Sequence, residues 1–310
     1  MGWSFDRRRI GVVLVVALSA AACSGGNGSG ATAVPSASAA ASAEARDFIA
    51  DFDIGGRTLS MACVGPTDTG RPTVIFEAGL GSDRRVWGAV LTELAATDRG
   101  CSYDRAGLGL SKPGPTPQTT DGQVDDLHAL LGAAGIKPPY VLVGHSSGGW
   151  NVMVYGGRYA SEVAGVVMVD VRPPLASDEF RKALPPEKAN EPEGIHQTRA
   201  DLNDWEHDPT RNPEGLDLIK SAQQAAASPG FGDRPLVVLT AEDRAAASEG
   251  LPTTLATTFD GIWMSLQAKL ATLSSKGRQE IVAGATHDMP DEKPDVVVKA
   301  IRDVMGDTGG

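Results

Sequence analysis

Apolar runs alternate with helical patterns over most of this chain. The stretches 140–143 and 163–169 are apolar or small at every position, whereas longer segments between such runs carry apolar residues on one helical face. Uninterrupted apolar strands are typical of a sheet covered on both faces, so this order predicts a parallel sheet with helices on both sides. We expect strands at 48–54, 57–64, 72–77, 101–104, 140–143, 163–169, 235–239 and 280–283, and helices at 85–96, 124–131, 149–159, 262–273 and 294–305.

Two features interrupt this alternation. Gly55-Gly56 separates the first two strands and predicts a two-residue hairpin turn. In 172–233, charge, proline and helical fragments replace the strand pattern, while Phe180, Leu184 and Trp205 supply apolar anchors. Because long structureless loops are uncommon inside compact domains, we interpret 172–233 as an inserted helical cap rather than a disordered loop. The folded core then comprises 46–171 and 234–310.

The first 45 residues do not follow the alternating pattern. Arg7 to Arg9 precede apolar or small residues at 10–22, a run shorter than the ~20 residues of a spanning helix, so 1–22 predicts a signal peptide. The run Ala20 to Cys23 resembles a bacterial lipobox, although Ala20 stands where that pattern usually has leucine. This resemblance implies lipidation of Cys23, followed by a flexible tether at 23–45 rich in serine, glycine and alanine. We expect an exported cell-envelope lipoprotein, with ordinary secretion as the alternative.

Composition and charge narrow the class of partner. With 28 Lys and Arg against 39 Asp and Glu, a net charge of −11 and 41% hydrophobic residues, the chain is typical of a soluble globular protein. An acidic surface repels phosphate backbones and anionic lipid, and we find no basic patch beyond Arg7 to Arg9. We therefore expect no nucleic-acid partner, membrane contact only through the lipid anchor, and a monomer.

Two further cysteines lie in strand-like stretches. Cys63 and Cys101 would be buried free thiols in a cytosolic protein. Export to an oxidising compartment makes them a candidate disulfide pair.

The residues 144–148 carry the strongest chemical signal. They read Gly-His-Ser-Ser-Gly, directly after a buried strand and before a helix. A nucleophile on such a tight turn needs small residues two positions before and after it, because a Cβ at Gly144 or Gly148 would collide with the neighbouring strand or helix. This context predicts Ser146 as a nucleophile; Ser147 is the alternative one residue out of register, and a glycine- and serine-rich turn without chemistry is the other interpretation.

A serine nucleophile needs a base, and the chain has 5 histidines. His287 immediately follows the last expected strand, where a loop can bring it over the edge of the sheet. The others lie in a helix, in the expected cap or on the turn itself, as His145 does. We therefore assign His287 as the general base. No metal site and no nucleotide-binding loop can be recognised, so we expect no metal and no cofactor.

Several motifs together resemble the serine type of α/β-hydrolase. Besides 144–148 and the His287 loop, they are Glu77-Ala78-Gly79-Leu80-Gly81 and Tyr103-Asp104-Arg105-Ala106-Gly107-Leu108-Gly109, and the resemblance covers about 48–305. It implies the α/β-hydrolase fold, a mostly parallel twisted sheet with helices on both faces and an inserted helical cap. It also implies an oxyanion hole at the backbone amides of Leu80 and Ser147. Here Ala78-Gly79 stands where the family commonly has His-Gly.

The resemblance leaves two candidates for the acid that orients His287. The usual family order of serine, acid and histidine implies Asp243, which follows the strand at 235–240. Asp170 follows the preceding strand, a site that supplies the acid in some relatives. Asp243 is the first choice and Asp170 the alternative.

These residues point to hydrolysis of a small-molecule ester or amide. The leading hypothesis is a carboxylic ester hydrolase that forms an acyl-enzyme on Ser146, because this chemistry needs no cofactor. An amide hydrolase of the aminopeptidase type is the runner-up, since acidic cap residues could bind an N-terminal amine. The candidate carboxylates are Glu191, Glu193, Asp201, Asp204 and Glu206. A catalytically inactive surface binding protein is the non-enzymatic alternative.

Overall fold

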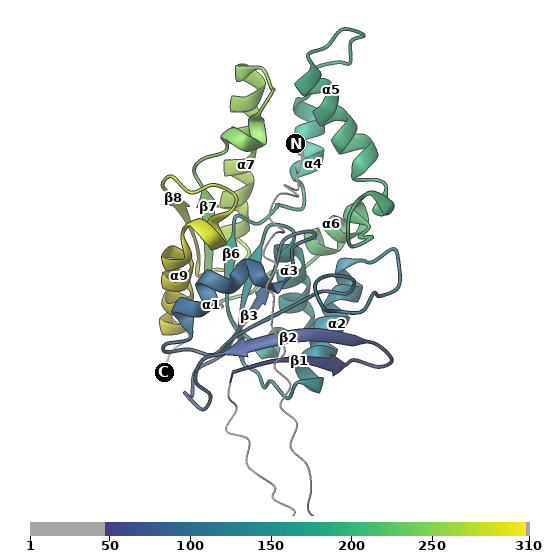
Figure 1. The fold of residues 1–310 in the computed structure, drawn as a ribbon. Helices are drawn as coiled ribbons and strands as arrows, with labels where there is room; N and C mark the ends of the chain where they lie inside the picture. Colours follow the sequence, from purple (N-terminus) through teal and green to yellow (C-terminus); the bar gives the residue numbers. More distant parts are fainter. Residues whose placement is uncertain (1–46, 308–310) are drawn as a thin grey trace, which may run out of the picture. The chain divides into compact units, whose positions relative to one another are not determined.

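The computed structural model describes residues 47–307. Its central element is a single β-sheet. Its strand order is β1-β2-β4-β3-β5-β6-β7-β8 (Figure 1). The strands are β1 Phe48–Asp53, β2 Thr58–Val64, β3 Thr73–Glu77, β4 Gly100–Tyr103, β5 Tyr140–His145, β6 Val163–Val169, β7 Leu236–Ala241 and β8 Gly277–Val282. The β1–β2 and β2–β4 pairs are antiparallel and the remaining pairs are parallel, so the predicted mostly parallel sheet is confirmed.

Helices cover both faces of this sheet. They are α1 Gly88–Leu94, α2 Thr120–Ala133, α3 Gly148–Arg158, α4 Ala176–Ala183, α5 Glu193–Ala200, α6 Leu218–Ala226, α7 Thr253–Ala271, α8 Met289–Glu292 and α9 Pro294–Asp307. Shorter helical turns are η1 Arg84–Trp87, η2 Ala160–Glu162, η3 Asp201–Trp205, η4 Pro209–Arg211 and η5 Ala245–Ser248. In β6, Val166 and Met168 join the hydrophobic cluster of α2, α3 and α6, whereas Val167 and Val169 join that of α1 and α9. This alternation explains why the central strands are apolar at nearly every position.

The edge strand β8 differs from the expectation. It begins at Gly277 instead of residue 280, and the side chain of Ile281 is 56% exposed. Only β7 pairs with it. The exposed Ile281 side chain shows that the sheet is not covered on both faces at β8, so that expectation is wrong for this strand.

The antiparallel end of the sheet contains two features expected from the sequence. Ile54 N–H donates to the Arg57 carbonyl at 2.9 Å, and Gly55 and Gly56, with φ of 102° and 100°, form the two-residue turn between β1 and β2. Cys63 of β2 faces Cys101 of β4 directly, and the two are joined by a disulfide. This bond links the hairpin to the strand that begins the parallel part of the sheet.

The helical segment between β6 and β7 does not form a layer on its own. Its helix α4 packs against α7, which follows β7, and the Phe180 and Phe259 rings stack with centroids 4.5 Å apart. Figure 1 shows α4, α5 and α7 extending together beyond the sheet. The helix α7 begins at Thr253, well before the expected residue 262, and this added length supplies the partner for α4. In contrast, α6 packs on α2 and α3 in the main core.

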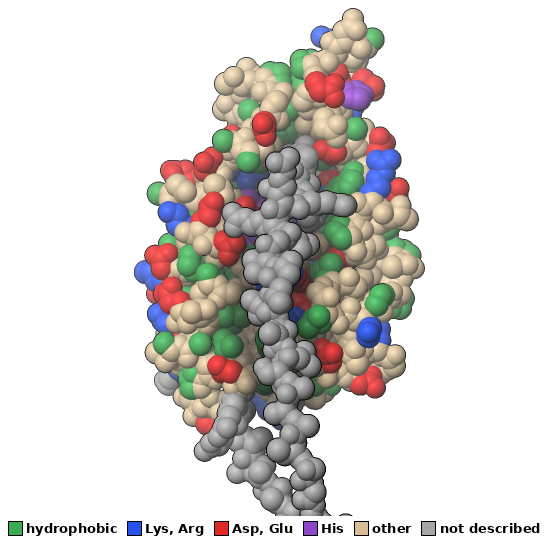
Figure 2. Space-filling model, viewed as in Figure 1, with side chains coloured by type: hydrophobic (Ala, Val, Ile, Leu, Met, Phe, Trp, Pro, Cys, Tyr) green, Lys and Arg blue, Asp and Glu red, His purple; other side chains and the backbone are tan. Residues whose placement is uncertain are grey.

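The expected signal peptide at 1–22, the tether and Cys23 lie outside the described residues. Within 47–307, no helix combines the length and apolar character needed to cross a membrane. Acidic side chains are spread over the face shown in Figure 2, interspersed with Lys and Arg.

Candidate active site

Ser146 occupies a strained turn between β5 and α3. Its φ is +53°, in the left-handed region that a residue with a side chain rarely adopts, and it is 1% exposed. A Cβ at Gly148 would lie 2.4 Å from the Ala78 carbonyl oxygen, and one at Gly144 would lie 2.9 Å from the Gly149 Cα. The turn therefore requires glycine at both positions, for the steric reason expected from the sequence.

His287 and Asp170 form a hydrogen-bonded pair beside this turn. The distance from His287 Nδ1 to Asp170 Oδ2 is 2.6 Å. Asp170 directly follows β6, and the preceding residue, Val169, accepts the Ser146 N–H through its carbonyl at 3.3 Å. The carboxyl ends of β5 and β6 and the loop after β8 thus bring a serine, an acid and a histidine to one edge of the sheet.

The surroundings of Asp170 keep it ionised. It is fully buried, and its Oδ1 accepts hydrogen bonds from Trp263 Nε1 and the Ala241 N–H, both at 3.2 Å. Burial raises the pKa of Asp170, but the hydrogen bond and charge of His287, together with the charge of Arg244 at 3.6 Å, outweigh it and hold this pKa below its ordinary value. An ionised Asp170 can orient the His287 imidazole and stabilise its protonated form.

Asp243, the first choice from the sequence, does not take this position. Its side chain accepts the Ala245 N–H at 2.9 Å within its own turn, and its backbone N–H donates to the Ala285 carbonyl at 2.9 Å. The structure corrects the partner of His287 from Asp243 to the alternative, Asp170. The turn after β7 uses the Asp243 carboxylate locally, which the order of residues along the chain does not reveal.

The Ser146 hydroxyl is buried and makes no hydrogen bond with any other residue in the described part of the chain. The His287 side chain is 28% exposed. Hydrogen bonds between a nucleophile and its base commonly tighten only when substrate binds.

His145 has a structural role that the sequence pattern does not predict. Its Nε2 lies 2.8 Å from the His287 backbone carbonyl, which can only accept, so Nε2 carries the proton. Burial, with a smaller effect of His287, lowers the pKa of His145 to about 3, so the ring is neutral near pH 7. His145 therefore anchors the His287 loop as a neutral donor. Its position next to Ser146 was the only sequence signal for this role.

The loop after β3 passes directly beside Ser146. A Cβ at Gly79 would lie 3.1 Å from the Ser146 Cβ. Within 47–307, neither the Leu80 N–H nor the Ser147 N–H donates a hydrogen bond. These are the two amides that the family resemblance implies for the oxyanion hole, and both can donate to a substrate oxygen.

Arg105 holds this loop from behind. The Arg105 guanidinium donates to the carbonyl oxygens of Ala78 and Gly79, both at 2.6 Å. It is almost fully buried. The Tyr-Asp-Arg motif thus contributes to the site by fixing the backbone next to Leu80.

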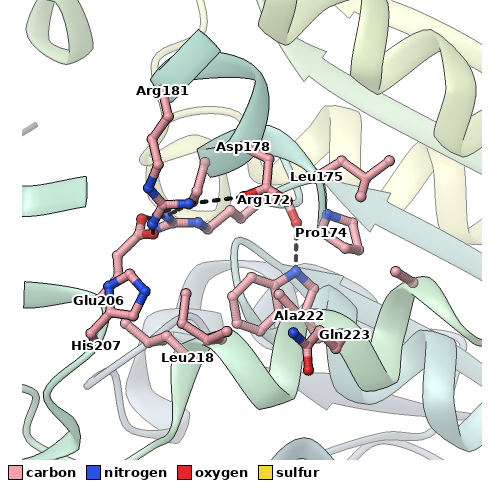
Figure 3. A pocket seen from close by; sticks show the side chains of 14 residues that line it. Arg172, Pro174, Leu175, Asp178, Arg181, Glu206, His207, Leu218, Ala222 and Gln223 are labelled. Carbon is pink, nitrogen blue, oxygen red and sulfur yellow. Dashed lines mark hydrogen bonds and ion pairs between the residues drawn. The ribbon is translucent and has the colours of Figure 1, made fainter. Parts of the chain in front are cut away.

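A cavity of about 160 Å³ lies among α3, α4 and α6, and its lining does not include Ser146, Asp170 or His287. It is lined by Trp150, Arg172, Pro174, Leu175, Ser177, Asp178, Arg181, Glu206, His207, Leu218, Ile219, Ala222, Gln223 and Ala226. Figure 3 shows Arg172 and Arg181 both pointing at Glu206, with which each forms an ion pair. The N–H of Arg172, a lining residue, donates to the Ser146 carbonyl at 3.0 Å and so joins the lining to the turn that carries Ser146.

No group of three or more His, Cys, Asp or Glu residues within the described range could hold a metal ion.

Comparison with known proteins identifies the family to which this chain belongs. The sequence profile described as "Alpha/beta hydrolase family" matches residues 74–300. The chain belongs to the alpha/beta hydrolase family. It is 27% identical over 236 residues to the uncharacterized protein YqjL of Bacillus subtilis (strain 168), a match that covers 75% of this chain and 83% of that protein.

Two solved structures show the same fold at lower identity. A thermophilic esterase from Thermogutta terrifontis superposes with a TM-score of 0.57 and 21% identity, covering 85% of this chain and 100% of the esterase. The enol-lactonase from Burkholderia xenovorans LB400 superposes with a TM-score of 0.57 and 18% identity, covering 83% of this chain and 100% of the lactonase. At these identities the similarity shows the fold alone.

Proposed function

We propose that this alpha/beta hydrolase cleaves carboxylic esters through an acyl-enzyme on Ser146. The observation that carries the proposal is the 2.6 Å hydrogen bond between His287 and the buried Asp170, made beside a strained serine turn. An esterase and an enol-lactonase share this fold. Neutral esters need an activated nucleophile and oxyanion donors but no cofactor.

The reaction follows from the roles of these groups. His287 takes the proton of the Ser146 hydroxyl as its oxygen attacks the ester carbonyl, and Asp170 stabilises the resulting imidazolium. The Leu80 and Ser147 amides donate to the oxyanion of the tetrahedral intermediate. When this intermediate collapses, the carbon–oxygen bond to the alcohol breaks and His287 returns the proton to the leaving alcohol. Water, deprotonated by His287, then releases the acid and restores Ser146.

We assign the cavity among α3, α4 and α6 to the acyl group, because its lining residue Arg172 is bonded to the Ser146 backbone. A cavity of about 150 Å³ holds a molecule the size of benzene, so this one fits an acyl chain of about four to six carbons. Trp150, Leu218 and Ala222 form apolar parts of its lining, and Arg172 connects it to the nucleophile turn.

The charges of the cap favour this ester hydrolase over an aminopeptidase. Glu206, the most buried of the candidate amine-binding carboxylates, is paired with Arg172 and Arg181. Glu191 is paired with Arg199 at 3.0 Å. Carboxylates that are already compensated bind a substrate ammonium poorly, because the arginines repel it.

Hydrolysis of a series of p-nitrophenyl esters, from acetate to dodecanoate, tests the proposal. We expect Ser146→Ala and His287→Ala to lower kcat by about 10³-fold or more. Ser147→Ala is the matched control: it removes the neighbouring hydroxyl but keeps the backbone amide, so its kcat should stay within about twofold of the wild type. Absence of turnover with every ester, or loss of activity in Ser147→Ala but not in Ser146→Ala, would refute the assignment. Labelling of Ser146 by a fluorophosphonate separates an active hydrolase from an inactive binding protein.

A further inference from the structure

A buried carboxylate from another part of the chain reaches the loop that carries Leu80. Glu214 lies between η4 and α6 and is 3% exposed. Its carboxylate accepts four hydrogen bonds, from the Gly81 N–H at 2.7 Å, from Arg105 Nε and Nη2 at 2.8 Å each, and from Gln123 Nε2 at 2.9 Å. Every one of these donors comes from the hydrolase core, so Glu214 ties the segment before α6 to the backbone beside Ser146.

The paired side chains of Glu214 and Arg105 bind the backbone on both sides of Leu80. Arg105 binds the carbonyls of Ala78 and Gly79 before Leu80, and Glu214 binds the N–H of Gly81 after it. The Leu80 N–H itself donates to no residue of the described chain. We propose that Glu214 is a positioning residue that holds the Leu80 amide in the orientation needed to donate to the oxyanion, an inference that rests on the proposed function.

The guanidinium of Arg105 lies between two carboxylates, and this explains why Glu214 controls the position of Arg105. Burial lowers the pKa of Arg105, but the carboxylates of Glu214 and Glu77 raise it above its ordinary value, so the guanidinium is a cation between two acids. Glu77 lies 3.4 Å from Arg105 Nη1 and also accepts the Tyr103 hydroxyl at 2.6 Å. If Glu214 lost its charge, we expect Arg105 to move toward Glu77 and carry the Ala78 and Gly79 carbonyls with it.

The backbone of this segment is held independently of the Glu214 carboxylate. Gln118 Nε2 donates to the Glu214 carbonyl at 2.8 Å, and the Gln118 N–H donates to the Gly215 carbonyl at 2.8 Å. A change in the Glu214 carboxylate alone should therefore alter the position of the loop that carries Leu80, while the backbone of the segment before α6 stays in place.

The test compares Glu214→Gln with Glu162→Gln in the full-length protein. Glu162, at the amino end of β6, accepts the Tyr155 hydroxyl at 2.6 Å and lies 3.2 Å from His128, so the control makes the same chemical change in a carboxylate away from the site. In Glu214→Gln we expect kcat and kcat/KM for p-nitrophenyl butyrate to fall together by about 10- to 100-fold, with KM changed less than about threefold. Glu162→Gln should keep kcat within about twofold of the wild type.

A trifluoromethyl ketone inhibitor separates positioning from simple structural support. It adds to the serine as a tetrahedral oxyanion, so its affinity for Glu214→Gln should fall by about the same factor as kcat/KM. Thermal unfolding monitors the fold of both variants. If Glu214→Gln keeps wild-type kcat and ketone affinity, the carboxylate supports the fold only and the inference is overturned.

Two further measurements leave no outcome undecided. If Glu214→Gln does not fold, Glu214→Asp replaces it, because the shorter acid keeps its charge near Arg105 but cannot also reach the Gly81 N–H. We expect this variant to have kcat and ketone affinity at least about tenfold below those of the wild type. Wild-type values of both would overturn the inference. Fluorophosphonate labelling of Ser146 identifies which claim has failed. A wild-type protein that neither labels nor hydrolyses esters refutes the proposed function and this inference with it, whereas equal labelling rates for the wild type and Glu214→Gln refute the inference alone.

Discussion

Asp170 and Asp243 follow adjacent strands but have different surroundings. Asp170 is buried and bonded to His287 and Trp263, whereas Asp243 closes the turn after β7 through the Ala245 N–H. We expect Asp170→Asn to lower kcat by about 10³- to 10⁴-fold, because an amide cannot stabilise the protonated imidazole or hold its tautomer. Asp243→Asn keeps an acceptor for the turn and should stay within about twofold of the wild type. The reverse ranking in the ester assay would restore Asp243 as the acid.

His145 predicts a pH dependence of stability. Its pKa is about 3 in the folded protein against 6.5 ordinarily, so below pH 6.5 the unfolded chain binds a proton that the folded chain does not. The stabilisation from neutral His145 is therefore complete above pH 6.5 and is lost progressively as the pH falls toward 3. His145→Gln removes this titration but can still donate to the His287 carbonyl. Urea unfolding of both proteins at several pH values between about 7 and 4.5 should show the steeper loss in the wild type; parallel curves would contradict the assignment.

At the residue scale, the sequence identified groups whose positions depend on local geometry. Ser146 was predictable because its strand, turn and glycines are contiguous, and His287 because it follows a strand directly. The partner of His287 stayed open between Asp243 and Asp170, because the contacts of Asp170 with His287 and with Trp263 of α7 join residues far apart along the chain. Glu214 gave no signal either, since its partners come from three separate segments.

At the scale of elements, α3 and the loop after β3 approach closely and thereby set the geometry of the turn that carries Ser146. A Cβ on Gly148 would lie 2.4 Å and 2.5 Å from the carbonyl oxygens of Ala78 and Glu77. We expect Gly148→Ala to lower the free energy of unfolding by about 1 to 3 kcal/mol and to reduce kcat, because those carbonyls must move and the Leu80 loop moves with them.

Gly132 in α2 provides the matched control. A Cβ there would meet no atom within 4 Å. Gly132→Ala should therefore raise the free energy of unfolding by about 0.5 to 1 kcal/mol, through helix propensity, with unchanged kcat. Urea unfolding and ester turnover measure both variants, and equal effects of the two substitutions would show that the close approach at Gly148 is unimportant.

The order of elements was largely predictable because strand and helix patterns are local. β5 and β6 are apolar on both faces and were recognised as central strands. For β8, the sequence pattern predicts a start later than Gly277 and does not indicate that the strand lies at the sheet edge. The start of α7 was also missed, since the apolar residues of its first half face α4 rather than the sheet.

At the scale of the whole molecule, segments from both sides of β7 build the region beyond the sheet. The contact between α4 and α7 joins residues that lie far apart in the sequence, which periodicity alone cannot pair. The sequence therefore indicated a cap at 172–233 but not its partner helix.

The cavity beneath this region predicts acyl-chain selectivity. We expect Leu218→Ala to move the preferred p-nitrophenyl ester toward longer chains, because it enlarges the cavity. Ala222→Phe should fill part of the same space and lower kcat/KM for hexanoate by about tenfold or more while sparing acetate. The two substitutions should change the chain-length preference in opposite directions, so each serves as the control for the other. If both variants keep the chain-length profile of the wild type, the acyl group binds elsewhere.

The central claim is that Ser146 becomes acylated during turnover. Acid-quenching the protein during hydrolysis of p-nitrophenyl butyrate and mapping its peptides by mass spectrometry tests this claim most directly. We predict a butyryl group, about 70 Da, on the Ser146 side chain of the wild type and none in Ser146→Ala, because the covalent intermediate forms only on the nucleophile. A butyryl group on Ser147 instead, or continued turnover by Ser146→Ala, would contradict the account.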